Sequence, residues 1–318
     1  MTLIALLGGC TSTSVTEKYQ DKRNDIINVK DKVIEFETGN VLIGSVSRLY
    51  MSNKCLLIAD HKSVDKQIHI FNKNDFSYLT SIGNFGEGPE EITVMGCLAI
   101  DEAHHQLYVS DHAKQKIFSY DMDSVMVDSL YKPQVKTAMN ETLFPSEYQY
   151  INDTLSIAVL IKPTSTSTFN QFLGRWNMNT GEMIPMKYTH PDIQKKRITF
   201  AASEKAGIYV ECYTRHDLMT ICSLDGELLY NIYGPDWDGG NGNKLQSFGT
   251  VMIGNDKIFV SYCGEDYARD SFPTKILVFD LEGNYLKTLE TGYKISDCCY
   301  DSVSYTHLRA HETSAHLV

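Results

Sequence analysis

Residues 70–74, IFNKN, are the first copy of a pattern that the chain repeats five times. In each copy an apolar run ends in an aromatic residue or Cys, and is followed by Asn, Asp or Ser, a spacer, and then Asn, Asp or Glu. The other copies are SYDMD at 119–123, RWNMN at 175–179, ICSLD at 221–225 and VFDLE at 278–282. The anchors Phe71, Tyr120, Trp176, Cys222 and Phe279 are 49, 56, 46 and 57 residues apart. A period of about 50 residues with several strand-like runs per unit is typical of β-propeller blades.

Each unit divides into short runs that are rich in β-branched and aromatic residues and bounded by polar turns. The second unit contains such runs at 96–100, 106–111, 116–120 and 124–128, and we expect all four to be strands. The fifth unit repeats the plan at 249–253, 257–262, 275–279 and 285–289. No long segment has sustained helical periodicity. The sequence therefore predicts an all-β, six-bladed propeller with about five blades and the first strand of a sixth, which begins near Tyr293.

The N-terminal ten residues resemble the end of a bacterial lipoprotein signal peptide. An apolar run at 3–7 is followed by Gly8, Gly9 and Cys10, as in a lipobox, where the Cys is lipidated. The run is too short to span a bilayer. No Lys or Arg precedes it, so the signal peptide is partial. We expect residues 1–10 to be this signal, with lipidation at Cys10, residues 11–30 to be a polar tether, and residues 31–302 to be the propeller.

The C-terminal segment does not continue the repeat. Residues 303–313, VSYTHLRAHET, match one reading frame of a transposase-type sequencing adapter. We therefore expect residues 303–318 to be a non-native tail without defined structure, and the natural chain to continue differently after Ser302. We also expect the shortened chain to be less stable than a complete propeller, because an open ring exposes strand edges. Histidines in this tail do not enter any metal-site argument.

The composition of the chain restricts the kinds of partner that it can bind. The net charge is −11 and 42% of residues are hydrophobic, which fits a large globular core and argues against nucleic acid, whose phosphates require clustered Lys and Arg. Eight cysteines have no zinc-type spacing. Since most lie in apolar runs, we expect mainly free buried thiols.

Two stretches resemble known propellers. Residues 83–91, GNFGEGPEE, look like the G-x-x-G-x-G-P-x-E connector of six-bladed TolB-like and NHL-like propellers, and residues 107–118 are similar to their blade core. With Cys10, the whole resembles TolB-like propeller lipoproteins of Bacteroidetes. The resemblance implies an envelope lipoprotein, in the outer membrane on its periplasmic face or at the cell surface, with no catalytic residues to carry over.

Matched side chains follow the second strand of two units. Asp60 and His61 in the first unit correspond to Asp111 and His112 in the second. Such pairs on one face can bind a ligand or metal, or hold a general base. The alternative is that each Asp caps its own turn, with the His exposed.

Other polar loops carry weaker signals. The glycines at 83–88 are interpreted as an interblade connector, because strands are expected on both sides. His104 and His105 fall in a hairpin turn, where solvated side chains are expected. Residues 236–243, DWDGGNGN, only loosely resemble a calcium loop, and Trp237 on this loop is a candidate contact for a sugar or peptide.

Two functional classes remain open. The first is a lipid-anchored binding or scaffold module for a peptide, glycan or partner protein. The second is a propeller-fold enzyme, a lyase, lactonase or glycosidase, with its site at the mouth of the central channel. The sequence contains no G-x-S-x-G nucleophile motif and no carboxylates that converge from several units. We therefore expect binding, without catalytic residues, cofactor or metal.

Overall fold

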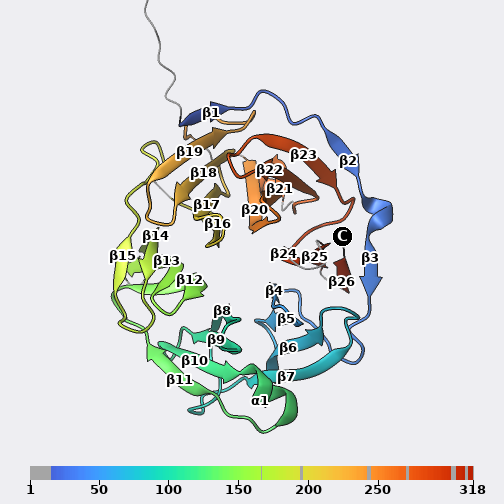
Figure 1. Ribbon diagram of the computed structural model, residues 1–318, viewed down its shortest axis with the longest axis vertical. Helices are drawn as coiled ribbons and strands as arrows, with labels where there is room; N and C mark the ends of the chain where they lie inside the picture. Colours follow the sequence, from blue (N-terminus) through green and yellow to red (C-terminus); the bar gives the residue numbers. More distant parts are fainter. Residues whose placement is uncertain are drawn as a thin grey trace, which may run out of the picture.

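Six β-sheets surround a central axis in the computed structural model of the chain (Figure 1). The structure describes residues 16–317 apart from residue 166 and residues 194–195, 242–244, 270–271, 302–305 and 312–313. In five of these sheets, four antiparallel strands that are consecutive in the sequence lie side by side, in order from the axis to the outside. Each of these sheets is one blade. The all-β, six-bladed prediction is confirmed. Cys10 lies outside the described residues.

The strands of the five complete blades have the following bounds. Blade 1 consists of β4 (Ser47–Met51), β5 (Cys55–Asp60), β6 (Lys66–Asn72) and β7 (Tyr78–Asn84). Blade 2 consists of β8 (Met95–Asp101), β9 (Gln106–Asp111), β10 (Lys116–Asp121) and β11 (Gln134–Ala138). Blade 3 consists of β12 (Phe144–Asn152), β13 (Leu155–Pro163), β14 (Phe169–Trp176) and β15 (Met183–Pro185). Blade 4 consists of β16 (Ile198–Ser203), β17 (Ile208–Tyr213), β18 (Leu218–Ser223) and β19 (Leu228–Tyr233). Blade 5 consists of β20 (Leu245–Gly254), β21 (Lys257–Asp266), β22 (Lys275–Asp280) and β23 (Tyr285–Glu290).

The repeated sequence pattern marks the end of the third strand in every blade. Its anchors, Phe71, Tyr120, Trp176, Cys222 and Phe279, are at most 2% exposed. The polar residue after each anchor closes the turn with its own side chain. Asp280 Oδ1, for example, accepts from the Glu282 and Asn284 N–H groups at 3.1 and 2.7 Å. The pattern is thus a buried anchor followed by an Asx or Ser turn, which is why it recurs once per blade.

Apolar side chains pack between neighbouring sheets all the way round the ring. One cluster joins blades 1 and 2 through Leu57 and Val109, and another joins blades 4 and 5 through Val210 and Val260. Equivalent clusters lie at the other four boundaries. The seven described cysteines are free and buried, in agreement with the expectation of buried thiols. Propeller stability therefore comes from face-to-face packing of whole blades.

The fourth run of the second unit is a helix and not the predicted strand. Residues 122–127 form α1 (Met122–Val127), and the outer strand of blade 2 is β11, further along the chain. The cause is an N-cap: Asp121 Oδ1 accepts from the Ser124 N–H at 2.7 Å, which stabilises the first turn of a helix.

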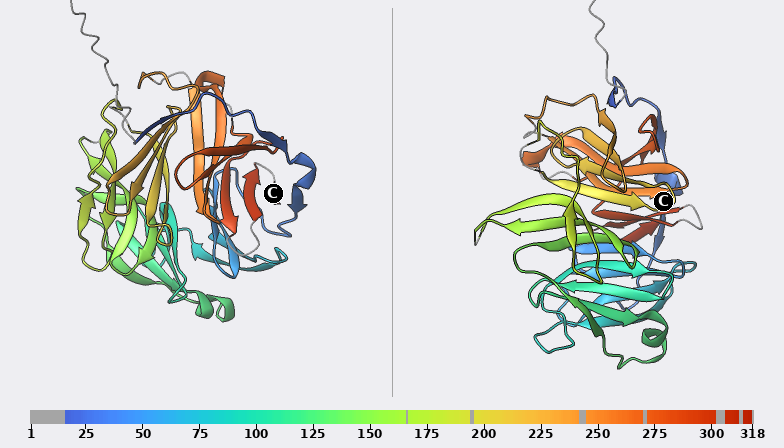
Figure 2. Two further views of the ribbon diagram at one scale, coloured as in Figure 1. Left: turned by 45° about the horizontal axis from the view of Figure 1, so that its top comes forward. Right: turned by 60° about the vertical axis from the view of Figure 1, so that its left-hand side comes forward.

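The N-terminal segment is docked on the ring from Thr16 onward, so the tether expectation is wrong for the described residues. It lies along the outside of the ring, as the blue segment shows in both Figure 1 and Figure 2. Strand β1 (Glu17–Tyr19) pairs in parallel with β19, and β2 (Ile26–Asn28) pairs in parallel with β23. A 3₁₀ turn, η1 (Lys30–Lys32), follows. Unpaired strand edges are available there, and backbone pairing needs no particular side chains.

The sixth sheet combines both ends of the chain. Its order is β24 (Asp297–Asp301), β25 (Thr306–His311), β26 (Ser314–Leu317) and β3 (Ile34–Phe36). The expectation that the segment after Ser302 has no defined structure is therefore wrong for β25 and β26. Their pairing uses backbone groups, which every sequence carries, so strand formation does not bear on the adapter origin proposed for residues 303–318.

Two ends of the sheets need names. The connector face is the end that carries the links between sheets, at 85–94, 139–143, 186–193, 234–241 and 291–296. The hairpin face is the opposite end and carries the turns after each innermost strand, at 52–54, 102–105, 153–154, 204–207 and 255–256.

Candidate functional site

A cavity of about 830 Å³ occupies the centre of the ring. Its walls come from the innermost strands of all six sheets, β4, β8, β12, β16, β20 and β24 (Figure 1). A volume of this size falls within the range of small-molecule sites. The central channel is therefore the candidate functional site.

An ion pair crosses the channel wall from blade 1 to blade 3. Arg48 Nη2 lies 2.7 Å from Glu147 Oε1, and the two side chains are 45% and 36% exposed because the channel is open to solvent. Pairing of exposed charges contributes little to stability. The pair instead places a guanidinium group, with further N–H donors, on the surface of the cavity.

Asp297 lies at the start of β24, where sheets 5, 6 and 1 meet. Its Oδ2 accepts from the Leu49 N–H at 2.8 Å, and its Oδ1 accepts from the Thr250 hydroxyl at 2.7 Å. Burial raises the pKa of Asp297, and these hydrogen bonds oppose the shift. Both oxygens are thus committed to holding three sheets together.

The structure brings the two predicted Asp-His pairs together on the connector face. Asp60 Oδ2 accepts from the Gly44 N–H and its Oδ1 from the Lys62 N–H, at 2.8 and 2.9 Å. Asp111 likewise accepts from four N–H groups, those of Thr93, Val94, Ala113 and Lys114. Each Asp therefore ties its own turn to the chain that enters its blade, which leaves these carboxylates little capacity for a ligand.

The two histidines are partly buried rather than exposed. His61 lines the channel cavity, and its Nδ1–H donates to the Met95 carbonyl at 3.2 Å. His112 lies against Gly96, where a Cβ atom would come within 2.4 Å of its Nε2. Burial lowers the pKa of both histidines, and Arg48 lowers that of His61 further. Both Nε2 atoms are buried without a hydrogen-bond partner among the described residues.

Trp237 lies apart from these pairs, at the connector end of blade 4. Its ring is 5.0 Å from that of Tyr233, 5.8 Å from that of His190 and 6.0 Å from that of His216, centroid to centroid. It is half-buried in this aromatic cluster. Asp236 beside it accepts from the Tyr262 hydroxyl at 3.1 Å. The structure thus places Trp237 in a packed cluster and not on the channel with His61.

The glycine-rich stretch is an interblade connector, as predicted. It joins β7 to β8 without a helix. Lys114 Nζ donates to the carbonyls of Gly88 and Glu91, at 2.6 Å each, and Glu91 Oε2 accepts from the Gly88 N–H at 2.8 Å. The loop is folded on itself and presents no row of free N–H groups to a phosphate.

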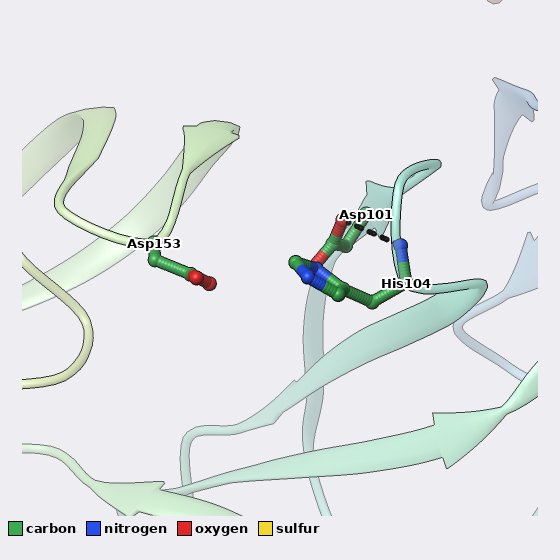
Figure 3. Close-up of side chains that lie close together, drawn as sticks. All are labelled: Asp101, His104 and Asp153. Atoms are coloured by element: carbon green, nitrogen blue, oxygen red, sulfur yellow. Dashed lines mark hydrogen bonds and ion pairs between the residues drawn. The ribbon is translucent and has the colours of Figure 1, made fainter.

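On the hairpin face, His104 makes contacts that the expectation of a solvated side chain missed. Its Nδ1 lies 2.8 Å from Asp101 Oδ2, and that hydrogen bond raises the pKa of His104. Figure 3 shows Asp153, from the neighbouring blade, facing the same imidazole ring. His105, next in the chain, pairs with Asp123 instead, at 2.7 Å.

Sequence reasoning missed Arg48, Glu147 and Asp297. Each is a charged residue of an innermost strand, and a search for charged residues on the first run of every unit finds all three, together with Asp101 and Asp301. Which of these side chains come into contact depends on how the ring closes, and the sequence does not directly show the distances between its blades.

Among the described residues, no helix is long and apolar enough to cross a bilayer.

Comparisons with solved structures agree on the architecture. A Bacteroides fragilis protein described as exported has a TM-score of 0.59 at 14% identity, over 95% of this chain and 97% of its own. A DUF4221-family member from Bacteroides vulgatus has a TM-score of 0.58 at 9% identity, over 90% and 94%. A gluconolactonase from Xanthomonas campestris has a TM-score of 0.52 at 13% identity, over 83% and 81%. At these identities the likeness shows the fold alone.

A search of curated proteins finds no match. The sequence does match one family, DUF5128, described as a 6-bladed beta-propeller, over residues 11–171. That span is 161 of 318 residues, slightly more than half of the chain. The chain therefore belongs to the DUF5128 family of six-bladed β-propellers.

Proposed function

We propose that this chain is a lipid-anchored propeller of the cell envelope that binds the end of an uncharged glycan in its central channel. The observation that carries the proposal is the channel cavity of about 830 Å³, whose walls come from all six sheets. A rigid ring of strands holds such a site in one geometry, as binding requires. The likeness of residues 83–91 to TolB-like and NHL-like connectors supports an envelope setting.

The charges on the channel wall favour an uncharged ligand. Arg48 and Glu147 neutralise each other at 2.7 Å. Asp297 is committed to Leu49 and Thr250, and the lowered pKa of His61 keeps that imidazole neutral near pH 7. A charged ligand would leave its charge without a free counter-charge. Tyr150, Phe200 and Phe272 add flat apolar surface to the same cavity, against which sugar rings can pack.

Among the described residues, the carboxylates in and beside the channel are not free to take part in catalysis. General acid–base chemistry requires a titratable group that is free to exchange a proton with a ligand. Glu147 is paired and the carboxylates of Asp60, Asp111 and Asp297 are hydrogen-bonded to the fold. We therefore prefer binding over hydrolysis for this cavity.

Glycan binding can be tested by titrating the full chain with neutral malto-, cello- and xylo-oligosaccharides, with oligogalacturonate and with a peptide library. We expect a neutral oligosaccharide to bind, and Arg48→Met to weaken that binding at least about tenfold, the equivalent of roughly 1.4 kcal/mol. Glu147→Gln should shift preference toward oligogalacturonate, because it frees the guanidinium charge.

A matched control for the channel pair exists on the outside of the ring. Arg175 pairs with Asp225 at 2.7 Å, with side chains 39% and 72% exposed. Arg175→Met should leave glycan binding unchanged. Binding of peptides alone, or equal losses in the Arg48 and Arg175 variants, would disprove the glycan proposal.

The lipid anchor rests on residues 7–10 and is tested separately. Expression with a basic signal-peptide segment placed ahead of residues 1–10 should send the protein into the detergent phase on phase partitioning, and Cys10→Ala should return it to the aqueous phase. If both forms stay in the aqueous phase, the anchor is refuted, whatever the channel binds.

A second candidate is a lactonase-type enzyme, since the propeller fold is shared with the Xanthomonas campestris gluconolactonase. One observation favours it: His61 Nε2 is an acceptor without a partner among the described residues. That atom is shielded from solvent, so this candidate ranks second. Lactone hydrolysis that is abolished by His61→Gln, with folding intact, would reverse the order.

A further inference from the structure

Three side chains with metal-binding atoms meet on the hairpin face, between blades 2 and 3. Asp101 is the last residue of β8, His104 lies in the turn that follows, and Asp153 lies in the turn after β12. One oxygen of each carboxylate and one nitrogen of the imidazole all lie within 4.8 Å of one another. In Figure 3 the ring of His104 lies between the two carboxylates.

The two carboxylates lack a permanent positive partner. Asp101 is 2% exposed, and a buried carboxylate is costly unless a charge or several donors compensate it. It accepts from the His104 N–H at 3.2 Å, and the His104 ring and the Tyr108 hydroxyl lie within 3.3 Å of it, but none of these donors is a permanent cation. In the part of the chain that the structure describes, no Lys or Arg lies within 4.0 Å of Asp101 or Asp153, and His104 is the basic group at that distance. Lys136 has its Nζ 5.5 Å from the centre of the Tyr108 ring, and not in an ion pair with either carboxylate.

Two tyrosines hold the carboxylates in place from outside the cluster. Tyr108 donates its hydroxyl to Asp101 Oδ2 at 3.3 Å, and Tyr150 donates to Asp153 Oδ1 at 2.7 Å. Metal ligands in proteins are oriented by this kind of outer hydrogen bond. The second oxygen of Asp153 has no hydrogen bond from a described residue, so the site has an open acceptor on its exposed side.

We propose that Asp101, His104 and Asp153 bind a divalent transition-metal ion, with Zn²⁺ as the best fit. One imidazole nitrogen and two carboxylate oxygens form a donor set that Zn²⁺ accepts at about 2.0–2.2 Å, with a water in the fourth position. Neighbouring ligand atoms are then about 3.4 Å apart, which the observed cluster reaches by small side-chain shifts. Mg²⁺ and Ca²⁺ prefer all-oxygen shells, which an imidazole does not supply.

The ion would join two blades at the end of the ring away from the connector face. Its ligands come from the hairpin after β8 and the hairpin after β12, which belong to different sheets. Binding in the folded state alone stabilises that state by mass action. Tyr150 also lines the central channel, but the three proposed ligands of the ion do not, so the metal proposal and the glycan proposal can each fail without the other.

The test is a Zn²⁺ titration of the chelator-treated full chain, without an affinity tag, followed by calorimetry and by a thermal melt. His307, His311 and His316 are replaced by Asn in all samples, so that these residues cannot bind the ion. We expect one Zn²⁺ per chain and a higher melting midpoint. His104→Ala and Asp153→Asn should each weaken binding at least about 100-fold, and Tyr150→Phe about tenfold.

His105→Ala is the matched control, because His105 is in the same turn and is also exposed, but pairs with Asp123 outside the cluster. It should bind Zn²⁺ as the parent chain does. Co²⁺ should give visible absorption bands that are lost with His104→Ala. The proposal is overturned if the His104 and Asp153 variants bind as tightly as the parent while keeping its far-UV spectrum, if His105→Ala loses as much affinity as His104→Ala, or if Mg²⁺ competes at equal concentration.

Discussion

The N-terminal segment serves the ring in two different ways. Strands β1 and β2 pair in parallel on the outside of blades 4 and 5, each of which already has four strands of its own. Strand β3, a few residues later, pairs antiparallel with β26 and is the outer strand of the sixth sheet. One segment therefore covers two finished edges and then completes an unfinished sheet.

The two kinds of pairing depend on different side chains to hold the N-terminal segment on the ring. Strands β1 and β2 are held to blades 4 and 5 by backbone hydrogen bonds, which need no particular side chain. A side-chain anchor between the two strands fixes the segment in addition. Arg23, between β1 and β2, supplies that anchor: its Nη1 is 2.8 Å from Asp217 Oδ1, with side chains 8% and 0% exposed. The guanidinium also lies 5.4 Å from the centre of the Tyr262 ring in blade 5. Strand β3 instead relies on Phe36, whose ring stacks on that of Phe76 at 4.3 Å.

The largest effect should come from breaking the Arg23 anchor. Arg23→Met leaves the Asp217 carboxylate buried without its counter-charge, which typically costs about 3–5 kcal/mol of unfolding free energy. The Asp236 N–H, 3.2 Å from Asp217 Oδ2, compensates only part of that charge. Urea denaturation, followed by tyrosine and tryptophan fluorescence, measures the loss.

Two further variants separate the anchor from a general effect on the segment. Lys18→Met removes a half-buried cation that lies 3.8 Å from the centre of the Tyr230 ring, and should cost less than about 1 kcal/mol. The double variant Arg23→Met with Asp217→Leu should recover most of the loss, because no buried charge remains. A double variant as unstable as Arg23→Met alone would contradict the role of the ion pair.

A smaller loss should follow from Phe36→Ala in β3. Phe36 is half-buried against the Phe71 and Phe76 rings, at 6.4 and 4.3 Å, so truncation removes part of a large apolar contact. We expect a loss of about 2 kcal/mol, together with faster proteolysis in residues 37–46. The control is Ile34→Ala, since Ile34 is 62% exposed and should change stability by less than about 0.5 kcal/mol. Equal losses would show that β3 is held by backbone pairing alone.

The repeated turns were predictable because their cause is local. The anchor at Phe279 and the turn at Asp280 lie side by side in the sequence, and the same chemistry recurs in each unit. The helix α1 was also within reach. Asp121 followed three residues later by Ser124 is an N-cap arrangement, but the β-branched run at 124–128 leads to the prediction of a strand instead.

The anchor and the channel could not be predicted in the same way. Arg23 and Asp217 are separated by 194 residues and meet only because the ring closes. Glu147 reaches Arg48 across blade 2 for the same reason. Asp101 and Asp153 face each other because hairpins of adjacent blades end at the same face. Repeats predict the blades, whereas contacts between blades depend on the angle of the ring.

The smallest expected effect is a change in the pH dependence of stability where β1 meets blade 4. His190 is 2% exposed, and burial lowers its pKa; the carboxylates of Asp192, Glu17 and Glu211 oppose this shift, whereas the Lys196 cation adds to it. Its Nδ1 accepts from the Asp192 N–H at 3.3 Å and its Nε2 lies 2.9 Å from the Tyr233 hydroxyl, so both nitrogens are engaged in the neutral form. Below about pH 6.5 the unfolded chain binds a proton that folded His190 resists, so stability falls as pH falls.

His190→Gln should make the decline in unfolding free energy between pH 7 and 5 shallower, while Tyr233→Phe, which keeps the histidine, should retain the slope. Part of the pH dependence should persist in His190→Gln, because burial also lowers the pKa values of four other histidines, His61, His69, His112 and His216. Identical slopes in the wild type and His190→Gln would show that His190 takes up its proton equally well in the folded and unfolded chains.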